Sequence, residues 1–350
     1  MKAQLILENG TRFTGTMFGY KATVVGEMVF AAGMTGYQEM LTDPSLAGHI
    51  VTMTFPLIGN YGINLEDNES PCTHLKALIV REKCNTPSNF RNEMNLEDFM
   101  EEKGVVGLEG IDTRALTKML RDNGSMKGVI AIGEPSDAEV KAIMDAFDNT
   151  KLIDEVTAKE VYEQNPGGKT HVAFIDLGTR ESIKTGLINQ DCKLTVFPAN
   201  VSADEIESVN PDMVFVSNGP DVPFAAKKTV ETIKALVGKY PIFGICTGHH
   251  IIALALGCKV EKLKFGRHCG GHPVREIKTG KVYIASQSQD YVVSECGADI
   301  EQTFVNVNDK TCEGICHKTL PIQSVQFPPS GDESDLSIEM LFGRFLKEVK

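Results

Sequence analysis

The 350-residue chain lacks several features that would place it in particular classes of protein. No apolar run approaches the roughly 18 residues that a membrane-spanning helix requires. The nine cysteines form no C-x-x-C pair, so neither a zinc site nor a disulfide framework is indicated, and we expect reduced thiols in a cytoplasmic protein. Basic residues are the minority, and a net charge of −12 argues against binding to nucleic acid or to an anionic membrane. Tryptophan is also missing, which excludes nothing.

The residues that are present have the composition of a soluble globular protein. Hydrophobic residues make up 42% of the chain and charged residues 23%, and the length suffices for two domains of ordinary size. The N-terminus alternates apolar and polar residues and reaches Glu8 early, so we expect no signal peptide.

The first half of the chain predicts a β-rich domain that ends in helices. Short alternating segments such as 3–7 and 27–30 favour strands separated by glycine turns. A helix is predicted over 113–122, with Asp112 as its N-cap and Gly124 as its stop. Another is predicted to begin at Ser136, where Glu139 occupies the capping-box position.

A loop signal separates this half from the rest. Asn165-Pro166-Gly167-Gly168 ends a polar stretch, so we assign residues 1–150 to a first domain, 151–169 to a linker and 170–350 to a second domain. From residue 170 on, continuous apolar strands alternate with helices. This order indicates an α/β domain with right-handed crossovers and a mostly parallel sheet that is covered on both faces.

The segment PIFGICTGHH around Cys246 has the pattern of a nucleophile turn. An apolar strand enters it, Gly244 and Gly248 flank the cysteine, and an apolar helix follows, as in the G-x-[SC]-x-G elbow that exposes a nucleophile at a helix N-terminus. A free thiol with a pKa of about 8.5 is only a few per cent ionised at neutral pH, so such a cysteine needs activation. The loop 217–220 after another strand is placed to add oxyanion donors. A small buried cysteine in a glycine-rich turn is the alternative interpretation.

Longer motifs identify a family resemblance that covers essentially the whole chain. SNGP at 217–220, FGICTGHH at 243–250 and KFGRHCGGHPV at 264–274 resemble class I (triad-type) glutamine amidotransferases, and most closely the glutaminase half of carbamoyl-phosphate synthetase. MTGYQEMLTDPSLAGHIVTMTFPLIGNYGIN at 34–64 and GIDTRALTKMLRDNG at 110–124 resemble the N-terminal domain of its small subunit, which other amidotransferases lack.

The resemblance implies a small subunit that hydrolyses glutamine and passes the ammonia to a large synthetase subunit. The two would form a heterodimer in the cytoplasm and make carbamoyl phosphate from bicarbonate and ATP for arginine and pyrimidine synthesis. ATP and magnesium are expected only on the large subunit, so no cofactor and no metal is expected in this chain. A nucleic-acid or membrane partner is not expected.

The chain departs from the family at several positions that bind glutamine. Thr247 and His250 stand where the elbow has leucine and glutamine, and Asp221 stands where the S-N-G-P-G-D-P loop has its second glycine. The Q-N-H-G-[FY] segment that clasps glutamine reads QSQDY at 287–291. The glutamine-site positions implied by the resemblance are Ser45, Gly219, Thr247, His250, Ser288, Asp290 and Tyr291, several of them substituted.

The catalytic partners of Cys246 are also replaced. The F-H-P-E motif, which supplies the triad histidine and glutamate, reads FPPS here, with Pro328 and Ser330 at those two positions. A positioned base typically contributes about 10²–10⁴-fold, and proline has no side-chain group that can accept a proton. We therefore predict that Cys246 keeps the nucleophile position in a pseudoenzyme, with glutaminase activity lost or severely weakened and with glutamine or free ammonia as the nitrogen source of the complex.

Other histidines leave an alternative open. An active glutaminase would need Cys246 to work with a non-standard base, for which His250 is the candidate. His268 and His272 are interpreted as structural residues of a glycine-rich loop, and their spacing with neighbouring cysteines fits no strong zinc signature. An unrelated thiol hydrolase on the same scaffold is a third possibility, which the complete N-terminal domain disfavours.

Overall fold

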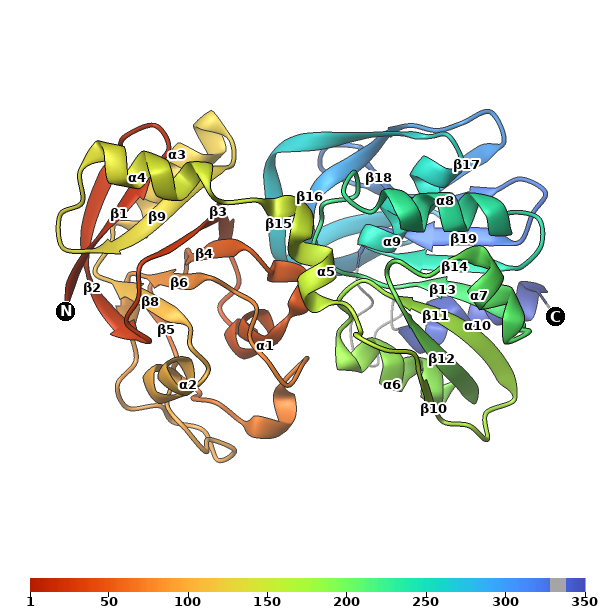
Figure 1. Ribbon diagram of the computed structural model, residues 1–350, viewed down its shortest axis with the longest axis horizontal. Helices are drawn as coiled ribbons and strands as arrows, with labels where there is room; N and C mark the ends of the chain where they lie inside the picture. The colour runs from red at the N-terminus through yellow and green to blue at the C-terminus, as the bar shows by residue number, and fades with distance from the viewer. Residues whose placement is uncertain (328–337, 350) are drawn as a thin grey trace. The chain divides into compact units, whose positions relative to one another are not determined.

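The computed structural model describes residues 1–327 and 338–349 and is shown in Figure 1. The chain divides into two compact units. Unit 1 comprises Met1–Asn149 and Lys264–His268, and unit 2 comprises Thr150–Leu263 and Cys269–Lys350.

Unit 1 is built on a closed barrel of seven strands. Four neighbouring strands (β3, β4, β6 and β8) run parallel, and the other pairs are antiparallel. Side chains such as Leu5, Met28, Ile50 and Leu108 point inward and form the core. Around the barrel the strands are β1 (Lys2–Leu7), β2 (Arg12–Gly19), β8 (Val106–Glu109), β6 (Ala77–Val80), β4 (His49–Met53), β3 (Val24–Ala31) and β9 (Met126–Ile132).

The helices of unit 1 begin and end at the residues that local chemistry favours. Asp112 accepts a hydrogen bond from the N–H of Ala115, and Gly124, at φ 96°, ends the helix, which confirms both predicted ends of α3. Ser136 and Glu139 form the predicted capping box. The elements of unit 1 outside the barrel are α1 (Tyr37–Thr42), α2 (Leu96–Glu102), α3 (Thr113–Asn123), α4 (Asp137–Asp145), the 3₁₀ turns η1 (Pro44–Leu46) and η2 (Leu65–Asp67), and the short strands β5 (Leu57–Ile58) and β7 (Glu82–Lys83).

Unit 2 contains a ten-stranded sheet. The strands β12, β11, β13, β14 and β19 are parallel neighbours, which confirms the expected α/β class, and the flanking pairs are antiparallel. In sheet order the strands are β10 (Tyr162–Gln164), β12 (Cys192–Pro198), β11 (Thr170–Asp176), β13 (Met213–Val216), β14 (Ile242–Ile245), β19 (Ile322–Val325), β18 (Cys312–His317), β17 (Ile300–Asn306), β15 (Lys259–Glu276) and β16 (Val282–Glu295).

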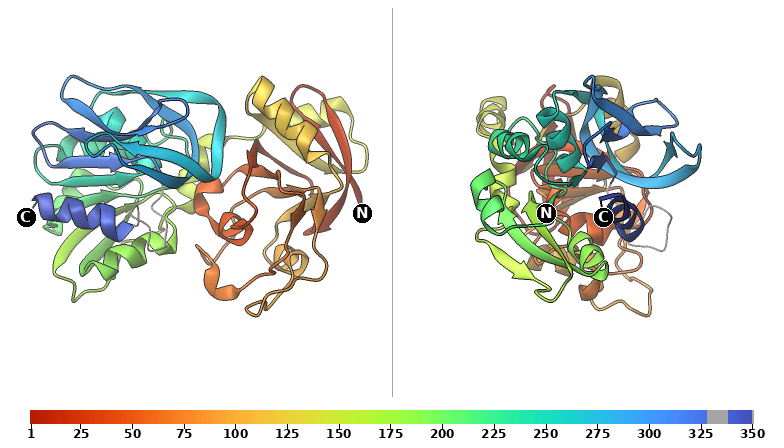
Figure 2. Two further views of the ribbon diagram at one scale, coloured as in Figure 1. Left: turned by 180° about the vertical axis from the view of Figure 1, so that it is seen from behind. Right: turned by 90° about the vertical axis from the view of Figure 1, so that its right-hand side faces the viewer.

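Helices cover both faces of this sheet, as Figure 2 shows. The helices α7 (Ala203–Ser208), α8 (Lys227–Leu236) and α9 (Thr247–Ala255) pack against one face, and α6 (Glu181–Asn189) and α10 (Ile338–Val349) against the other. Along β11, Phe174 joins the core under α6 and α10, whereas Ile175 joins the core under α8 and α9. Burial on both faces explains why the strand sequence is apolar throughout rather than alternating.

Two segments differ from what the sequence pattern suggested. Over 151–169, where a linker was predicted, the structure places helix α5 (Leu152–Val156), which follows the turn η3 (Asn149–Lys151), and strand β10, which pairs with β12 at the edge of the sheet. The prediction of a loop around His268 and His272 was wrong, since both residues lie within the 18-residue strand β15. Glycine weakens the interior of a strand without excluding it, so Gly270 and Gly271 are compatible with the strand that the structure shows.

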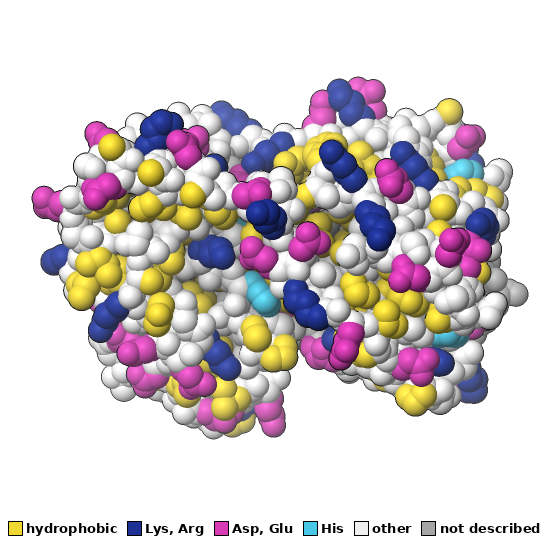
Figure 3. Space-filling view, in the orientation of Figure 1, with side chains coloured by type: hydrophobic (Ala, Val, Ile, Leu, Met, Phe, Trp, Pro, Cys, Tyr) yellow, Lys and Arg dark blue, Asp and Glu magenta, His cyan; other side chains and the backbone are white. Residues whose placement is uncertain are grey.

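The surface agrees with the composition. On the face drawn in Figure 3, acidic and basic side chains are interspersed rather than gathered by sign. No helix within the described part of the chain is long and apolar enough to cross a membrane.

Candidate functional site

Cys246 occupies a strained turn between β14 and α9 in unit 2. Its backbone lies at φ 51° and ψ −115°, a conformation that is unusual for a residue other than glycine. Such strain is found where a fold over-determines one position, often at a functional site. The strand, turn and helix predicted around this cysteine are therefore present, and the turn displays the residue at the carboxyl end of a parallel strand, where α/β sheets place their ligands.

The two flanking glycines lie in closely packed surroundings. A Cβ atom on Gly248 would lie 2.3 Å from the carbonyl oxygen of Val216, and one on Gly244 would lie 2.4 Å from Cδ1 of Ile252. The clash at Gly248 is with backbone and admits no side chain, whereas at Gly244 the Ile252 side chain would have to move. Glycine at position 248 is thus a packing requirement of the turn.

The thiol of Cys246 is enclosed. The residue is 1% exposed, and its Sγ donates a hydrogen bond to the carbonyl oxygen of Ser288 at 3.2 Å. The backbone N–H of Cys246 donates to Val325 O at 2.9 Å, which fixes the turn to the neighbouring strand β19. The bond to Ser288 uses the proton of the thiol, so it is present only while the sulfur is protonated.

The loop after β13 is tied to the start of α9. Thr247 Oγ1 donates to Gly219 O at 2.7 Å, and Ser217 Oγ accepts the N–H of Leu177 at 2.9 Å. A Cβ atom on Gly219 would lie only 2.1 Å from Leu177 O, so this position too admits no side chain without a shift. The loop predicted to face the cysteine is therefore held rigidly beside it.

Two residues that depart from the family pattern are each other's partners. His250 Nδ1 lies 2.8 Å from Asp221 Oδ1, and both side chains are buried, with 0% and 4% exposure. The second carboxylate oxygen, Oδ2, accepts the backbone N–H groups of Asp290 at 2.7 Å and of Tyr291 at 2.8 Å. The sequence shows Asp221 only as a replacement of the second glycine of the loop, because its bridging role depends on three elements that the fold brings together.

Neither histidine of the elbow helix is hydrogen-bonded to the thiol. His249 Nδ1 pairs with Ser324 Oγ at 2.8 Å, and the Nε2 atoms of His249 and His250 have no hydrogen-bond partner within the described ranges 1–327 and 338–349. Complete burial, aided by the neighbouring His250, lowers the pKa of His249 well below its ordinary value, because desolvation disfavours the imidazolium. His249 is consequently a neutral imidazole at physiological pH.

The other predicted positions are distributed over both units. Ser288, Asp290 and Tyr291 lie on β16 in unit 2. Ser45 lies in unit 1, in the turn η1, where its N–H donates to Asp43 Oδ1 at 2.9 Å. Pro328 and Ser330, the two replaced triad positions, lie outside the described residues.

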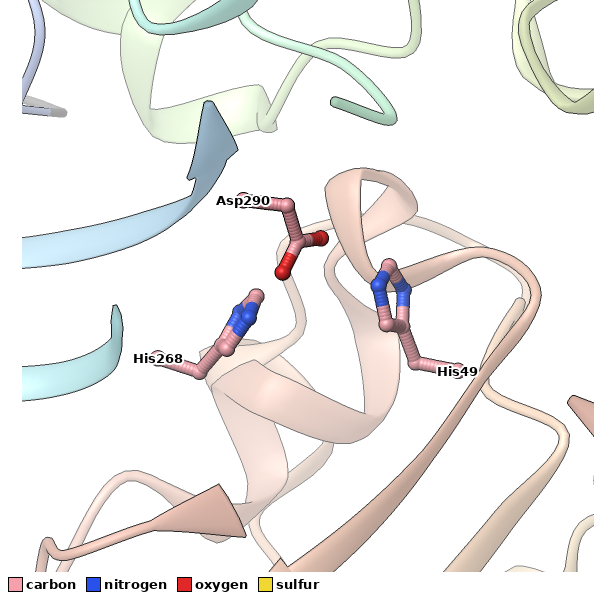
Figure 4. A group of neighbouring side chains, drawn as sticks. All are labelled: His49, His268 and Asp290. Atoms are coloured by element: carbon pink, nitrogen blue, oxygen red, sulfur yellow. The ribbon is translucent and has the colours of Figure 1, made fainter. Parts of the chain in front are cut away.

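Unit 1 contains a pair of buried histidines that the sequence pattern did not bring together. The rings of His49 on β4 and His268 have centroids 5.4 Å apart and planes inclined by 50° (Figure 4). Asp290, which Figure 4 also draws, belongs to unit 2.

The sequence analysis did not predict a role for Ser217 or Ser324, which bind Leu177 N–H and His249 Nδ1. Each is a buried small hydroxyl at or just after the end of a parallel strand, one bracing the loop and the other orienting His249. The available signal was their position, because polar residues at the carboxyl ends of apolar strands commonly line sites.

Two family models match the chain. "Carbamoyl-phosphate synthase small chain, CPSase domain" matches residues 5–130, and "Glutamine amidotransferase class-I" matches residues 173–348. The chain is 49% identical to the carbamoyl phosphate synthase small chain of Clostridium perfringens, with 99% of both chains covered. It is 44% identical to the small chain of Caldanaerobacter subterraneus, with 100% of this chain and 97% of that one covered. It is 42% identical to the pyrimidine-specific small chain of Bacillus subtilis, with 100% and 96% covered.

Proposed function

Because this chain belongs to the carbamoyl-phosphate synthase small-chain family and is a small subunit with an amidotransferase domain, we propose that it supports carbamoyl phosphate synthesis with its own glutaminase lost or severely weakened. Free ammonia would then supply the nitrogen to the assembled enzyme. The observation that carries this proposal is the replacement of the triad histidine and glutamate by Pro328 and Ser330.

The size of the expected loss follows from the missing proton acceptor. A positioned general base contributes about 10²–10⁴-fold, which corresponds to about 3–5 kcal/mol of barrier height. Asp221 also argues against glutamine binding, because its carboxylate already accepts the N–H groups of Asp290 and Tyr291 beside the cysteine.

The partner would be a carbamoyl-phosphate synthetase large subunit, in a heterodimer in the cytoplasm. That subunit would bind ATP and magnesium and use bicarbonate, and the product would enter arginine or pyrimidine synthesis. The match of both family models over most of the chain supports a subunit that keeps the framework for this assembly.

One specific observation favours a second candidate, an active glutaminase with His250 as the base. Its Nδ1 lies 2.8 Å from Asp221 Oδ1, and His250 follows Cys246 by four residues, so the chain contains the chemical groups of a nucleophile, a base and an orienting carboxylate. The Nε2 atom would have to reach the thiol by a change of rotamer.

Glutamate release distinguishes the two candidates. The chain is assembled with its cognate large subunit, assembly is verified by size-exclusion chromatography with light scattering, and glutamate formation from glutamine is measured with wild type, Cys246→Ser and His250→Asn. We expect the three complexes to give the same background. Glutamate release that requires both Cys246 and His250, together with a trapped glutamyl thioester on Cys246, would establish the second candidate instead.

A further inference from the structure

The Asp221 carboxylate is unusual in what surrounds it. Both of its oxygens are used by groups from other parts of unit 2: Oδ1 by His250 on α9, and Oδ2 by the N–H groups of Asp290 and Tyr291 on β16. The side chain is buried, and the three contacts measure 2.8, 2.7 and 2.8 Å. Hydrogen bonds to an ionised carboxylate of this length are among the strong ones in proteins.

The donors would form an anion site without the aspartate. Two successive backbone N–H groups that converge on one point, with an imidazole beside them, are an arrangement that attracts negative charge. Asp221 itself comes from the loop between β13 and α8, so the carboxylate and its donors are brought together only by the fold. The N–H groups of Asp290 and Tyr291 and the His250 ring thus form an anion site, and the Asp221 carboxylate of the same chain fills it.

This arrangement lies next to Cys246. The thiol donates to Ser288 O, two residues before Asp290, and Thr247 Oγ1 donates to Gly219 O, two residues before Asp221. The segment 288–291 and the loop 219–221 therefore both contact the elbow around Cys246, and they also meet each other at the Asp221 carboxylate.

We propose that Asp221 is an internal occupant of a small-carboxylate subsite beside Cys246, and that it excludes the carboxylate of an amino-acid substrate such as glutamine. The inference rests on the proposed function and deepens it, because an occupied carboxylate subsite disables substrate binding independently of the missing base. Removal of the Asp221 side chain uncovers the subsite but restores no proton acceptor, so it restores binding and not turnover.

Selective alkylation of Cys246 tests the proposal. Iodoacetate and iodoacetamide both form a bond between the sulfur and the methylene carbon as iodide leaves, but only iodoacetate carries a carboxylate. Labelling of the Cys246 peptide is followed by mass spectrometry in wild type, Asp221→Ala and Asp221→Asn. We expect the ratio of iodoacetate to iodoacetamide labelling to rise at least about tenfold in Asp221→Ala, since a repelling charge is replaced by free donors. In Asp221→Asn, which retains one acceptor oxygen, we expect a smaller rise.

A stability measurement protects the test against misfolding. Formate and acetate should raise the melting temperature of Asp221→Ala in a concentration-dependent manner, relative to chloride at equal ionic strength. The melting temperature of wild type should be the same in all three salts. L-Glutamine should protect Cys246 of Asp221→Ala from iodoacetate. Asp176→Ala is the matched control: this buried carboxylate accepts the N–H groups of Ala158, Gly178 and Thr179, and its loss should not change the labelling ratio at Cys246.

An unchanged labelling ratio in folded Asp221→Ala, or no stabilisation of that variant by formate, would overturn this inference and leave Asp221 a structural residue. That outcome is separate from failure of the proposed function, which is measured as Cys246-dependent glutamate release by the wild-type complex.

Discussion

The buried His249 should make the stability of unit 2 depend on pH, and the substitution His249→Asn should reduce that dependence. An asparagine amide can replace Nδ1 in the hydrogen bond to Ser324 Oγ, and Nε2 has no partner to lose among residues 1–327 and 338–349. The variant therefore removes the ionisable group while it keeps the one polar contact of the ring. A loss of buried volume lowers its stability at neutral pH as well.

The sign and size of the effect follow from the lowered pKa. In the unfolded chain the imidazole titrates near its ordinary value of 6.5, whereas burial keeps it neutral in the folded chain. Below pH 6.5 the unfolded state binds a proton that the folded state does not, so the stability that is present above that pH is lost as the pH falls. Between pH 7.5 and 5.5 the loss of unfolding free energy is on the order of 1 kcal/mol.

Urea unfolding at pH 7.5 and at pH 5.5 measures this difference. We expect the unfolding free energy of His249→Asn to fall on the order of 1 kcal/mol less than that of wild type between the two pH values. Ser324→Ala is the matched control, because it removes the hydrogen bond and leaves the imidazole; it should be about 1 kcal/mol less stable and keep the wild-type pH dependence. Equal pH dependence in wild type and His249→Asn would refute the reasoning.

Three further predictions concern other parts of the chain. Gly219→Ala should lower unfolding free energy by about 2 kcal/mol or more, because its Cβ would meet Leu177 O at 2.1 Å; differential scanning fluorimetry that shows no loss would contradict the packing argument. A hydrogen bond from Cys312 lowers the pKa of Cys296 below that of an ordinary thiol, so the midpoint of its alkylation by iodoacetamide should lie at a lower pH than that of a free thiol; an ordinary midpoint would count against it. Phe90 is 96% exposed, and Phe90→Ser should weaken binding of the large subunit about tenfold in biolayer interferometry without a change in melting temperature; unchanged affinity would exclude it from the interface.

Local signals in the sequence predicted local structure well. The two ends of α3 were predicted because capping is local. Asp112 accepts a hydrogen bond from the first turn of the helix, and Gly124 adopts the positive φ that ends it. The elbow could be predicted for the same reason, since small residues such as Gly244 and Gly248 flank a nucleophile where a strand turns sharply into a helix.

Non-local pairing was beyond the reach of these patterns. The closure of the barrel joins β1 to β9, whose residues are more than a hundred positions apart, and no short window contains that information. The strand character of the segment around His268 was likewise missed, because its glycines are typical of loops.

The contact between Asp221 and His250 could not be predicted from either residue alone. Each residue taken alone is a departure from a family motif, and only the fold places the two side chains 2.8 Å apart. The usable signal was their joint replacement, an acid gained in one motif and a histidine in the other.

The nitrogen source of carbamoyl phosphate tests the central claim most directly. The chain is assembled with its cognate large subunit, and product formation from bicarbonate and ATP is measured with glutamine or with ammonium chloride, in wild type and in Cys246→Ser. We predict formation with ammonium in both proteins and no glutamine-supported formation above the Cys246→Ser level. Glutamine-supported formation in wild type that disappears in Cys246→Ser would contradict the account.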